Sequence, residues 1–311
     1  MEKIRCDILN DPSPARSPLV AYALASIAIL CWAGNFIVGR VANLELPPIS
    51  LSFWRHVLAA LMVLPFFLPA LKKDWPLVKQ NTGMFLLLSF LFVAGNTLVY
   101  FCVLHTAVIN AALINAGVPV VVAFFSWLIL RQLVNRWQGL GILISFIGIA
   151  IVVTRSNLAT LQAFDFRLGD LFMLLAVISW AVYMVLFRRA AIQISPWTLL
   201  FVLCAMGAVW LIPAYAVEIA MGYRSTVSFA SIGAIVYVAL FSTILAWACW
   251  NASVMQIGPN RTAAFMNLHP VFGAALAIPL LGETLQHYHF SGTALVLIGV
   301  FLVSRTWKDG A

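Results

Sequence analysis

The sequence predicts an all-α integral membrane protein with ten transmembrane helices, arranged as two inverted repeats of five helices. The composition is 63% hydrophobic and 9% charged, far outside the range of soluble globular proteins. The apolar runs continue for about 20 residues, the length of a helix that crosses a bilayer. They lack the alternation of barrel strands. Residues of the first half of the chain also recur in the second half.

The internal repeat is carried by two groups of residues. Trp32-Ala33, Arg40 and Pro48 recur 148 residues later as Trp180-Ala181, Arg188 and Pro196. Pro119, Gly141 and Gly148 recur 151 residues later as Pro270, Gly292 and Gly299. Because each copy holds an odd number of spans, the second copy is inverted relative to the first. Inverted repeats are typical of alternating-access carriers, whose substrate site lies between the repeats.

The ten spans follow one another with short connections, most of them marked by Pro or Gly. The predicted spans are 19–42, 48–71, 82–104, 107–130, 135–155, 169–190, 196–219, 229–254, 261–281 and 288–306. We read the first span as a retained helix, because its apolar run is too long for a signal peptide. The chain therefore divides into a tail over 1–17, a first repeat over 18–155, a loop over 156–168, a second repeat over 169–306 and a tail over 307–311.

Lys and Arg are distributed unequally between the two sides of the predicted bundle. Thirteen of the 18 fall on the side of the termini, and five (Arg40, Arg55, Arg155, Arg167 and Arg224) fall on the other. Positive residues favour the cytoplasmic side, so both termini are predicted to be cytoplasmic in a multi-pass protein of the cell inner membrane. The net charge of +8 is then explained by topology, and no nucleic-acid partner is expected.

Cofactor and metal chemistry is not predicted. The five cysteines (Cys6, Cys31, Cys102, Cys204 and Cys249) show no metal-ligand spacing, and no phosphate-binding loop is present. All ten acidic residues lie in tails, loops or span ends, so no carboxylate proton relay is evident within the membrane. Transport is then either facilitated movement down a gradient or is coupled through a histidine or Glu283.

Polar and aromatic residues near the centres of spans are the candidates for a substrate pathway. Several share one helix face, such as Trp32 with Asn35 and Asn96 with Tyr100. They predict a central cavity with aromatic walls and amides that orient a polar ligand; the alternative is that they only pack and bridge helices. The candidate substrate-binding residues are Trp32, Asn35, Asn96, Tyr100, Asn115, Trp180, Tyr183, Trp247, Trp250, Asn251 and Asn267.

Five further residues are candidates for movement or coupling. Pro119 and Pro270 each free a backbone carbonyl within a span and are predicted hinges, with a static bend as the alternative. Arg55 could pair with a substrate carboxylate, or extend to the interface and meet Glu45. His269 is either a proton carrier or a histidine bonded within the bundle, and Glu283 is the remaining candidate for coupling.

The chain resembles the drug/metabolite transporter superfamily, and within it the EamA-type branch, over almost its whole length. The first helix carries Cys31-Trp32-Ala33-Gly34-Asn35-Phe36 with Arg40, and the ninth carries Asn267-Leu268-His269-Pro270 followed by Leu281-Gly282-Glu283. The resemblance implies ten helices and a carrier of amino acids, other metabolites or drugs, usually an exporter. One position departs from the family pattern, because Gln132 stands at the repeat equivalent of Glu283.

Together these observations predict a transporter, rather than an enzyme, that exports small metabolites. Amino acids, with neutral and aromatic ones in particular, suit a cavity with amides and no central acid. The expected partners are the small-molecule substrate and the lipid bilayer, and the oligomeric state is open. The alternatives are an exporter of drugs or lipophilic cations, which usually need an acidic countercharge, and an intramembrane lipid-modifying enzyme, which would need a recognisable catalytic constellation.

Overall fold

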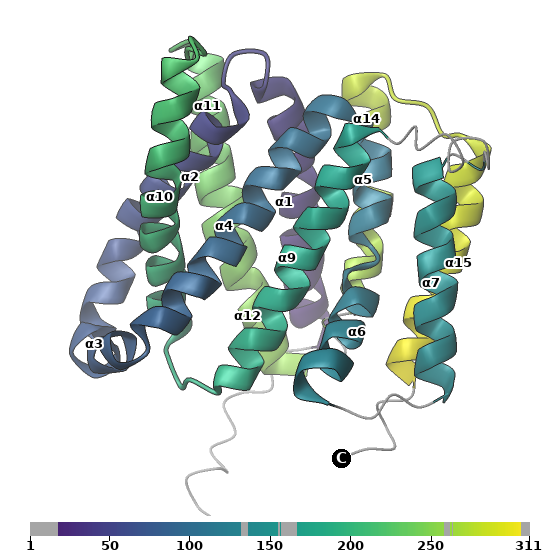
Figure 1. Ribbon diagram of the computed structural model, residues 1–311, viewed down its shortest axis with the longest axis horizontal. Helices are drawn as coiled ribbons and strands as arrows, with labels where there is room; N and C mark the ends of the chain where they lie inside the picture. Colours follow the sequence, from purple (N-terminus) through teal and green to yellow (C-terminus); the bar gives the residue numbers. More distant parts are fainter. Residues whose placement is uncertain are drawn as a thin grey trace, which may run out of the picture.

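The computed structural model describes residues 18–131, 136–154, 167–257 and 264–305, together with Ser156 and Thr262. Within these residues every regular element is a helix, and the helices form one bundle (Figure 1). The elements are α1 (Pro18–Ala42), α2 (Pro48–Phe67), η2 (Leu68–Ala70), α3 (Leu71–Gln80), α4 (Thr82–His105), α5 (Val108–Asn115), α6 (Val118–Leu130), α7 (Arg136–Thr154), α9 (Leu168–Ala190), α10 (Pro196–Ala220), α11 (Phe229–Tyr237), η3 (Val238–Leu245), α12 (Ala246–Ile257), η4 (Ala264–Leu268), α14 (His269–Leu281) and α15 (His287–Arg305).

The helices have the length and composition of membrane spans. Seven stretches of the described chain are long and apolar enough to cross a bilayer: 19–42, 48–70, 82–105, 108–130, 168–190, 196–220 and 229–257. The other three predicted spans coincide with shorter apolar helices over 139–154, 265–281 and 287–302. The all-α membrane protein is confirmed, and ten complete crossings stay a prediction.

Large apolar side chains cover the outside of the bundle. Leu61, Leu143 and Phe301 are each exposed over more than half of their surface, although they lie in helices whose opposite faces are buried. In water such surfaces would be costly, whereas lipid tails are as apolar as the side chains themselves. The exposure pattern therefore fits a bundle surrounded by lipid.

Several features of the spans and their connections were not predicted from the sequence. The connection after the second span contains a helix of its own, α3, which holds Pro76 in its interior. The fourth span is interrupted at residues 116–117, and the ninth begins as a 3-10 helix. Pro119 and Pro270 therefore lie in the first turns of α6 and α14. The N–H groups of a first turn have no partner within the helix, so the missing N–H of proline costs no helical hydrogen bond there. These prolines begin helices and do not kink continuous ones.

The two ends of the bundle carry different elements. The upper end in Figure 1 carries the α1–α2 connection and the starts of α5, α9 and α15; the lower end carries α3 and the ends of α6 and α9. The charge distribution in the sequence predicts that the lower end faces the cytoplasm. We call α1–α7 the first half of the chain and α9–α15 the second half.

Helices α7 and α15 approach each other through glycine. A Cβ atom added to Gly148 would lie 2.9 Å from the carbonyl oxygen of Gly292, and one added to Gly299 would overlap the carbonyl oxygen of Gly141. These two contacts show that the helices run antiparallel. Gly141 and Gly148 are the repeat equivalents of Gly292 and Gly299, so exchanging the two halves turns one contact into the other.

Candidate substrate site at the centre of the bundle

An arginine lies buried between helices of both halves. Arg55 of α2 is only 3% exposed. Its Nε atom donates a hydrogen bond to the Thr243 hydroxyl of η3 at 2.8 Å, and its Nη1 atom donates to the Tyr100 hydroxyl of α4 at 2.9 Å. The guanidinium group is thus held by two hydroxyl oxygens that come from different halves of the chain.

Tyr100 extends this cluster to α1. Its side chain is fully buried, and its hydroxyl donates a hydrogen bond to Oδ1 of Asn35 at 3.0 Å. The ring lies against Gly39, where an added Cβ atom would come within 2.7 Å of the ring carbon Cδ1. We call Arg55, Tyr100, Asn35 and Thr243 the Arg55 cluster.

The backbone around Thr243 is unusual. Element η3 is a π-helix, a form that recurs at functional sites. The Thr243 hydroxyl donates to the carbonyl of Val238, five residues earlier, at 2.8 Å, while accepting from Arg55. The neighbouring carbonyl of Ser242 accepts a hydrogen bond from the indole N–H of Trp32 at 3.0 Å. The π-helix therefore provides contact points for side chains of α1 and α2.

Among the residues that the structure describes, no carboxylate is bonded to Arg55. Its recorded polar partners are uncharged hydroxyls, and the described carboxylates, which all lie near helix ends, make their contacts elsewhere. Glu45 accepts a hydrogen bond from the Ser228 hydroxyl, whereas Arg55 donates to Thr243 and Tyr100. Burying an ion without a countercharge costs on the order of several kcal/mol, even after the surroundings relax. The cluster is therefore suited to an anionic group.

Two aromatic groups flank the centre of the bundle. Trp32 packs on Trp250 with ring centroids 5.4 Å apart. Trp180 and Tyr183 contact each other at 5.7 Å, and both contact Phe92 of α4, at 5.2 and 5.9 Å respectively. Six of the eleven candidate residues thus meet in the Arg55 cluster or in these two groups.

The remaining candidates do not join these contacts directly. The amides of Asn96 and Asn251 donate to carbonyls of their own helices, while Asn115 is half-buried in α5. Trp247 packs at the edge of the core that contains Tyr183.

Several buried polar atoms have no hydrogen-bond partner within the described part of the chain. They include the indole nitrogen of Trp247 and Oδ1 of Asn267. The His269 ring is fully buried and packs edge-on against Phe36 at 4.9 Å. Leaving such groups unpaired is costly, which makes this region a candidate for further polar contacts with a ligand.

Glu283 lies at the upper end, away from the predicted pathway. Its carboxylate accepts hydrogen bonds from the backbone N–H groups of Val108, at 2.7 Å, and Ile109, at 2.9 Å. These are unpaired donors of the first turn of α5, where negative charge is favourable. The geometry gives Glu283 a helix-capping contact between the halves. Gln132, its repeat equivalent, lies outside the described residues.

The upper end carries further polar contacts between the halves. The Glu218 carboxylate accepts from the backbone N–H of Ser50 at 2.8 Å and from its hydroxyl at 2.6 Å. Thr106 donates to Asp170 at 2.6 Å. Glu45 and Glu283 complete a set of four carboxylates, each bonded to the opposite half. The sequence places these acids at span ends but does not reveal their partners.

At the lower end, Asp74 of α3 is the one described carboxylate. It accepts from the Thr198 hydroxyl at 2.6 Å and from the Ser195 N–H at 3.2 Å. Burial raises the pKa of Asp74, but these hydrogen bonds and the charge of Lys73 outweigh that effect, so its pKa lies below the ordinary value. The contact joins the end of the second span to the start of α10.

Two cavities lie outside the Arg55 cluster. One, of about 550 Å³, opens at the lower ends of α6 and α9. The other, of about 330 Å³, lies between α1 and α11 near the upper end. Neither is lined by a predicted substrate residue, so the central cavity stays a prediction. Ser52, Arg55 and His56 are all buried in α2, and these polar residues within one apolar span are the sequence feature that could have pointed to the cluster.

The chain is similar to known transporters in sequence and to a solved structure in fold. The model of the EamA-like transporter family matches residues 19–154 and again residues 167–305. An uncharacterized transporter of Bacillus subtilis, YyaM, is 28% identical over 260 residues, covering 83% of this chain and 84% of the relative. A probable amino-acid metabolite efflux pump of Salmonella typhimurium is 27% identical over 295 residues, covering 90% and 93%. A solved crystal structure with 17% identity superimposes with a TM-score of 0.59, covering 91% of this chain and 95% of the other, which shows a common fold.

Proposed function

Because this chain belongs to the EamA-like transporter family, we propose that it exports small metabolites, most of all amino acids, across the inner membrane. The relative named as a probable amino-acid metabolite efflux pump supports this substrate class. Neutral or aromatic amino acids are the favoured substrates, since the aromatic groups around Trp32 and Trp180 offer apolar contacts for a side chain.

The charge of Arg55, which no carboxylate of the described residues compensates, carries the proposal. A guanidinium group binds a carboxylate through two parallel hydrogen bonds, and such charge-assisted bonds are roughly twice as strong as neutral ones. Tyr100 and Thr243 hold the group in place from two helices. In the substrate complex we expect the amino-acid carboxylate to approach Arg55 and its side chain to contact the aromatic groups.

Alternating access between two inverted repeats is the proposed mechanism. The reciprocal glycine contacts of α7 and α15 support a two-fold relation between the halves. The packing of α1 against α12 and α14 also has its counterpart in the packing of α9 against α4 and α6. The substrate would then be exposed to each side in turn as the halves move against each other.

An exporter of lipophilic cations is the alternative, and the charge of Arg55 counts against it. Two like charges in a medium of low dielectric constant repel strongly, so a cationic substrate would be disfavoured near the cluster. A lipid-modifying enzyme is less consistent with a family of transporters.

Uptake into liposomes that contain the purified full-length protein tests the proposal. We expect saturable uptake of a radiolabelled amino acid, competed by other amino acids but not by the corresponding amines without a carboxylate. Arg55→Gln should reduce the uptake at least tenfold. Arg224→Gln removes the same charge from an exposed connection and should leave it unchanged.

Two outcomes would contradict the proposal. Folded protein that takes up no amino acid of a complete panel would exclude this substrate class. Uptake of lipophilic cations that is equal in the wild type and Arg55→Gln would instead favour the alternative.

A further inference from the structure

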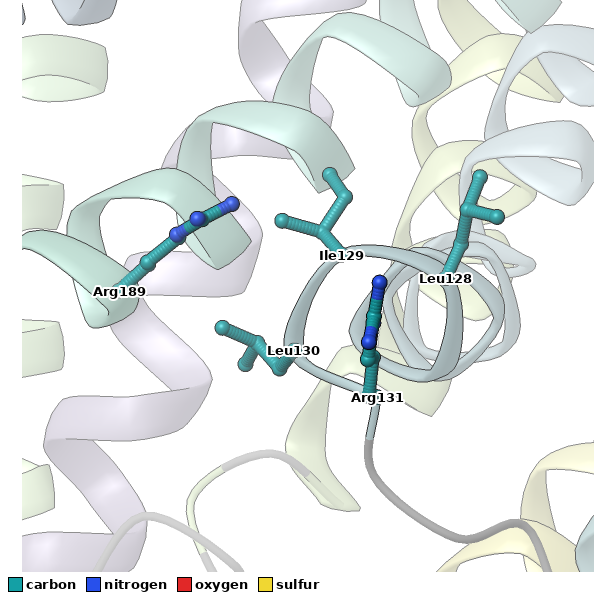
Figure 2. Close-up of a pocket in the computed structure, with 5 residues that line it drawn as sticks. All are labelled: Leu128, Ile129, Leu130, Arg131 and Arg189. Carbon is teal, nitrogen blue, oxygen red and sulfur yellow. The ribbon is translucent and has the colours of Figure 1, made fainter.

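We propose that the cavity at the lower ends of α6 and α9 binds the phosphate group of an anionic phospholipid. This cavity of about 550 Å³ is lined by Leu128, Ile129, Leu130, Arg131 and Arg189. Figure 2 shows Arg131 and Arg189 on either side of Ile129 and Leu130, so that cationic and apolar groups surround one space. We call it the lower cavity.

The two arginines of the lower cavity come from different halves of the chain. Arg131 ends α6 and Arg189 lies in the last turn of α9, two helices that pack against each other. Both side chains are exposed, and neither has a recorded carboxylate partner within the described residues. Phosphate oxygens are strong acceptors for guanidinium groups, so one phosphate could be bound from both helices.

The apolar wall favours a lipid over a free phosphate ion. Leu128 is 55% exposed and the adjacent Trp127 is 48% exposed, and both lie in α6, within the stretch 108–130 that is long and apolar enough to span the membrane. Tryptophan is enriched at the membrane interface. A phospholipid has charge and hydrocarbon next to each other, and the lower cavity offers a matching arrangement.

The predicted orientation places the lower cavity in the cytoplasmic leaflet. Anionic lipids attract basic residues at this surface, and basic pockets between transmembrane helices bind their head groups. At the upper end four carboxylates join the halves, whereas at the lower end the described residues include a single such carboxylate, Asp74. A bound phosphate would add a polar contact between the halves at the end where only one described carboxylate joins them.

Lipid binding can be measured independently of transport. The full-length protein in detergent is titrated with phosphatidylglycerol, with phosphatidylcholine and with inorganic phosphate, and bound lipid is counted by native mass spectrometry. The test variant carries Arg131→Asn and Arg189→Gln; asparagine is chosen because Arg131 has a positive φ of 53°, which asparagine tolerates. The control variant carries Arg188→Gln and Arg224→Gln, which removes the same charge outside the cavity.

We expect the wild type and the control to bind phosphatidylglycerol at least tenfold more tightly than the test variant does. Phosphatidylcholine should bind weakly to all three proteins. An equal loss in the test and control variants would overturn the proposal, because general charge would then explain the binding. Full competition by inorganic phosphate would also overturn it, in favour of a free-anion site.

A wild-type protein without preference for phosphatidylglycerol would show that the arginines only complement the carbonyl ends of α6 and α9. Circular dichroism checks that the test variant is folded. If it is not, Arg189→Gln alone replaces it, since this exposed side chain can be shortened without changing the backbone, and the same comparison decides the proposal.

Discussion

The hydroxyl of Tyr100 joins the guanidinium group of Arg55 to the amide of Asn35. It accepts from Nη1 of Arg55 at 2.9 Å and donates to Oδ1 of Asn35 at 3.0 Å. Arginine can only donate, so the single hydroxyl proton is directed to Asn35. The direction of the whole chain of hydrogen bonds, from α2 through α4 to α1, is thereby fixed.

Removing this hydroxyl should weaken substrate binding. Tyr100→Phe removes one of the two hydroxyl partners of Arg55 and the hydroxyl partner of Asn35, and we expect KM for the transported amino acid to rise about tenfold, the effect of roughly 1–1.5 kcal/mol per lost hydrogen bond. Flux kinetics in liposomes measure it. Tyr223→Phe, at an exposed tyrosine, is the control, and an unchanged KM in folded Tyr100→Phe protein would argue against the cluster as the binding site.

The contact of α7 with α15 should not tolerate a side chain at Gly148. A Cβ atom there would lie 2.9 Å from backbone atoms of α15, which have no flexible end that could move away. Gly148→Ala should lower the free energy of unfolding by about 1–3 kcal/mol, as overpacking does. Unfolding in detergent measures this change.

The matched control for Gly148 lies in the same helix. Gly139 has no atom within 4 Å of an added Cβ, so Gly139→Ala should be neutral or stabilise by up to about 1 kcal/mol through helix propensity. Equal changes in the free energy of unfolding for the two substitutions would mean that the close approach of α7 and α15 does not cause the loss of stability.

Glu218 should stabilise the start of α2. Its carboxylate accepts two hydrogen bonds from Ser50 and is itself buried. Glu218→Ala leaves these donors unpaired and should cost about 1–3 kcal/mol, whereas Glu218→Gln keeps one acceptor and should cost less. Denaturant unfolding of both variants ranks them, and a glutamine variant as unstable as the alanine variant would exclude a hydrogen-bonding role.

Asp74 should make stability depend on pH in the acid range. Its pKa is lower in the folded protein than in the unfolded chain, so its contribution is fully present above the unfolded value of about 3.9. The contribution is lost as the pH falls from there through the folded pKa. Thermal unfolding of wild type and Asp74→Asn between pH 7 and pH 3 should therefore converge at low pH. A constant difference across this range would show that the charge of Asp74 is irrelevant.

The sequence predicted the spans because the lipid bilayer requires a long, continuous apolar run in each of them. All ten predicted ranges coincide with helical segments to within a few residues. It missed α3, because a connecting helix at the membrane surface has no such run, and it missed the π-helix, whose hydrogen bonds to Trp32 and Arg55 join residues far apart in the sequence.

The candidate site was predicted only in part, for a related reason. The sequence predicts Asn35 and Tyr100 as site residues because they are polar and lie near the centres of spans, and their side chains are hydrogen-bonded to each other. It predicts Asn96 and Asn251 on the same ground, but their side-chain amides donate hydrogen bonds to carbonyl groups of their own helices. Which of these solutions a polar side chain adopts depends on tertiary contacts that one sequence does not specify.

The contact of Trp32 with Ser242 has a consequence for biosynthesis. The two residues are 210 positions apart, and α1 also packs against α12 and α14, near the end of the chain. At a synthesis rate of about 5–20 residues per second, the ribosome needs on the order of 10–40 s to supply these partners. During that interval the polar groups of the first helix wait in the membrane without their final contacts, so the nascent chain is most vulnerable to misassembly and proteolysis before its last third has been translated.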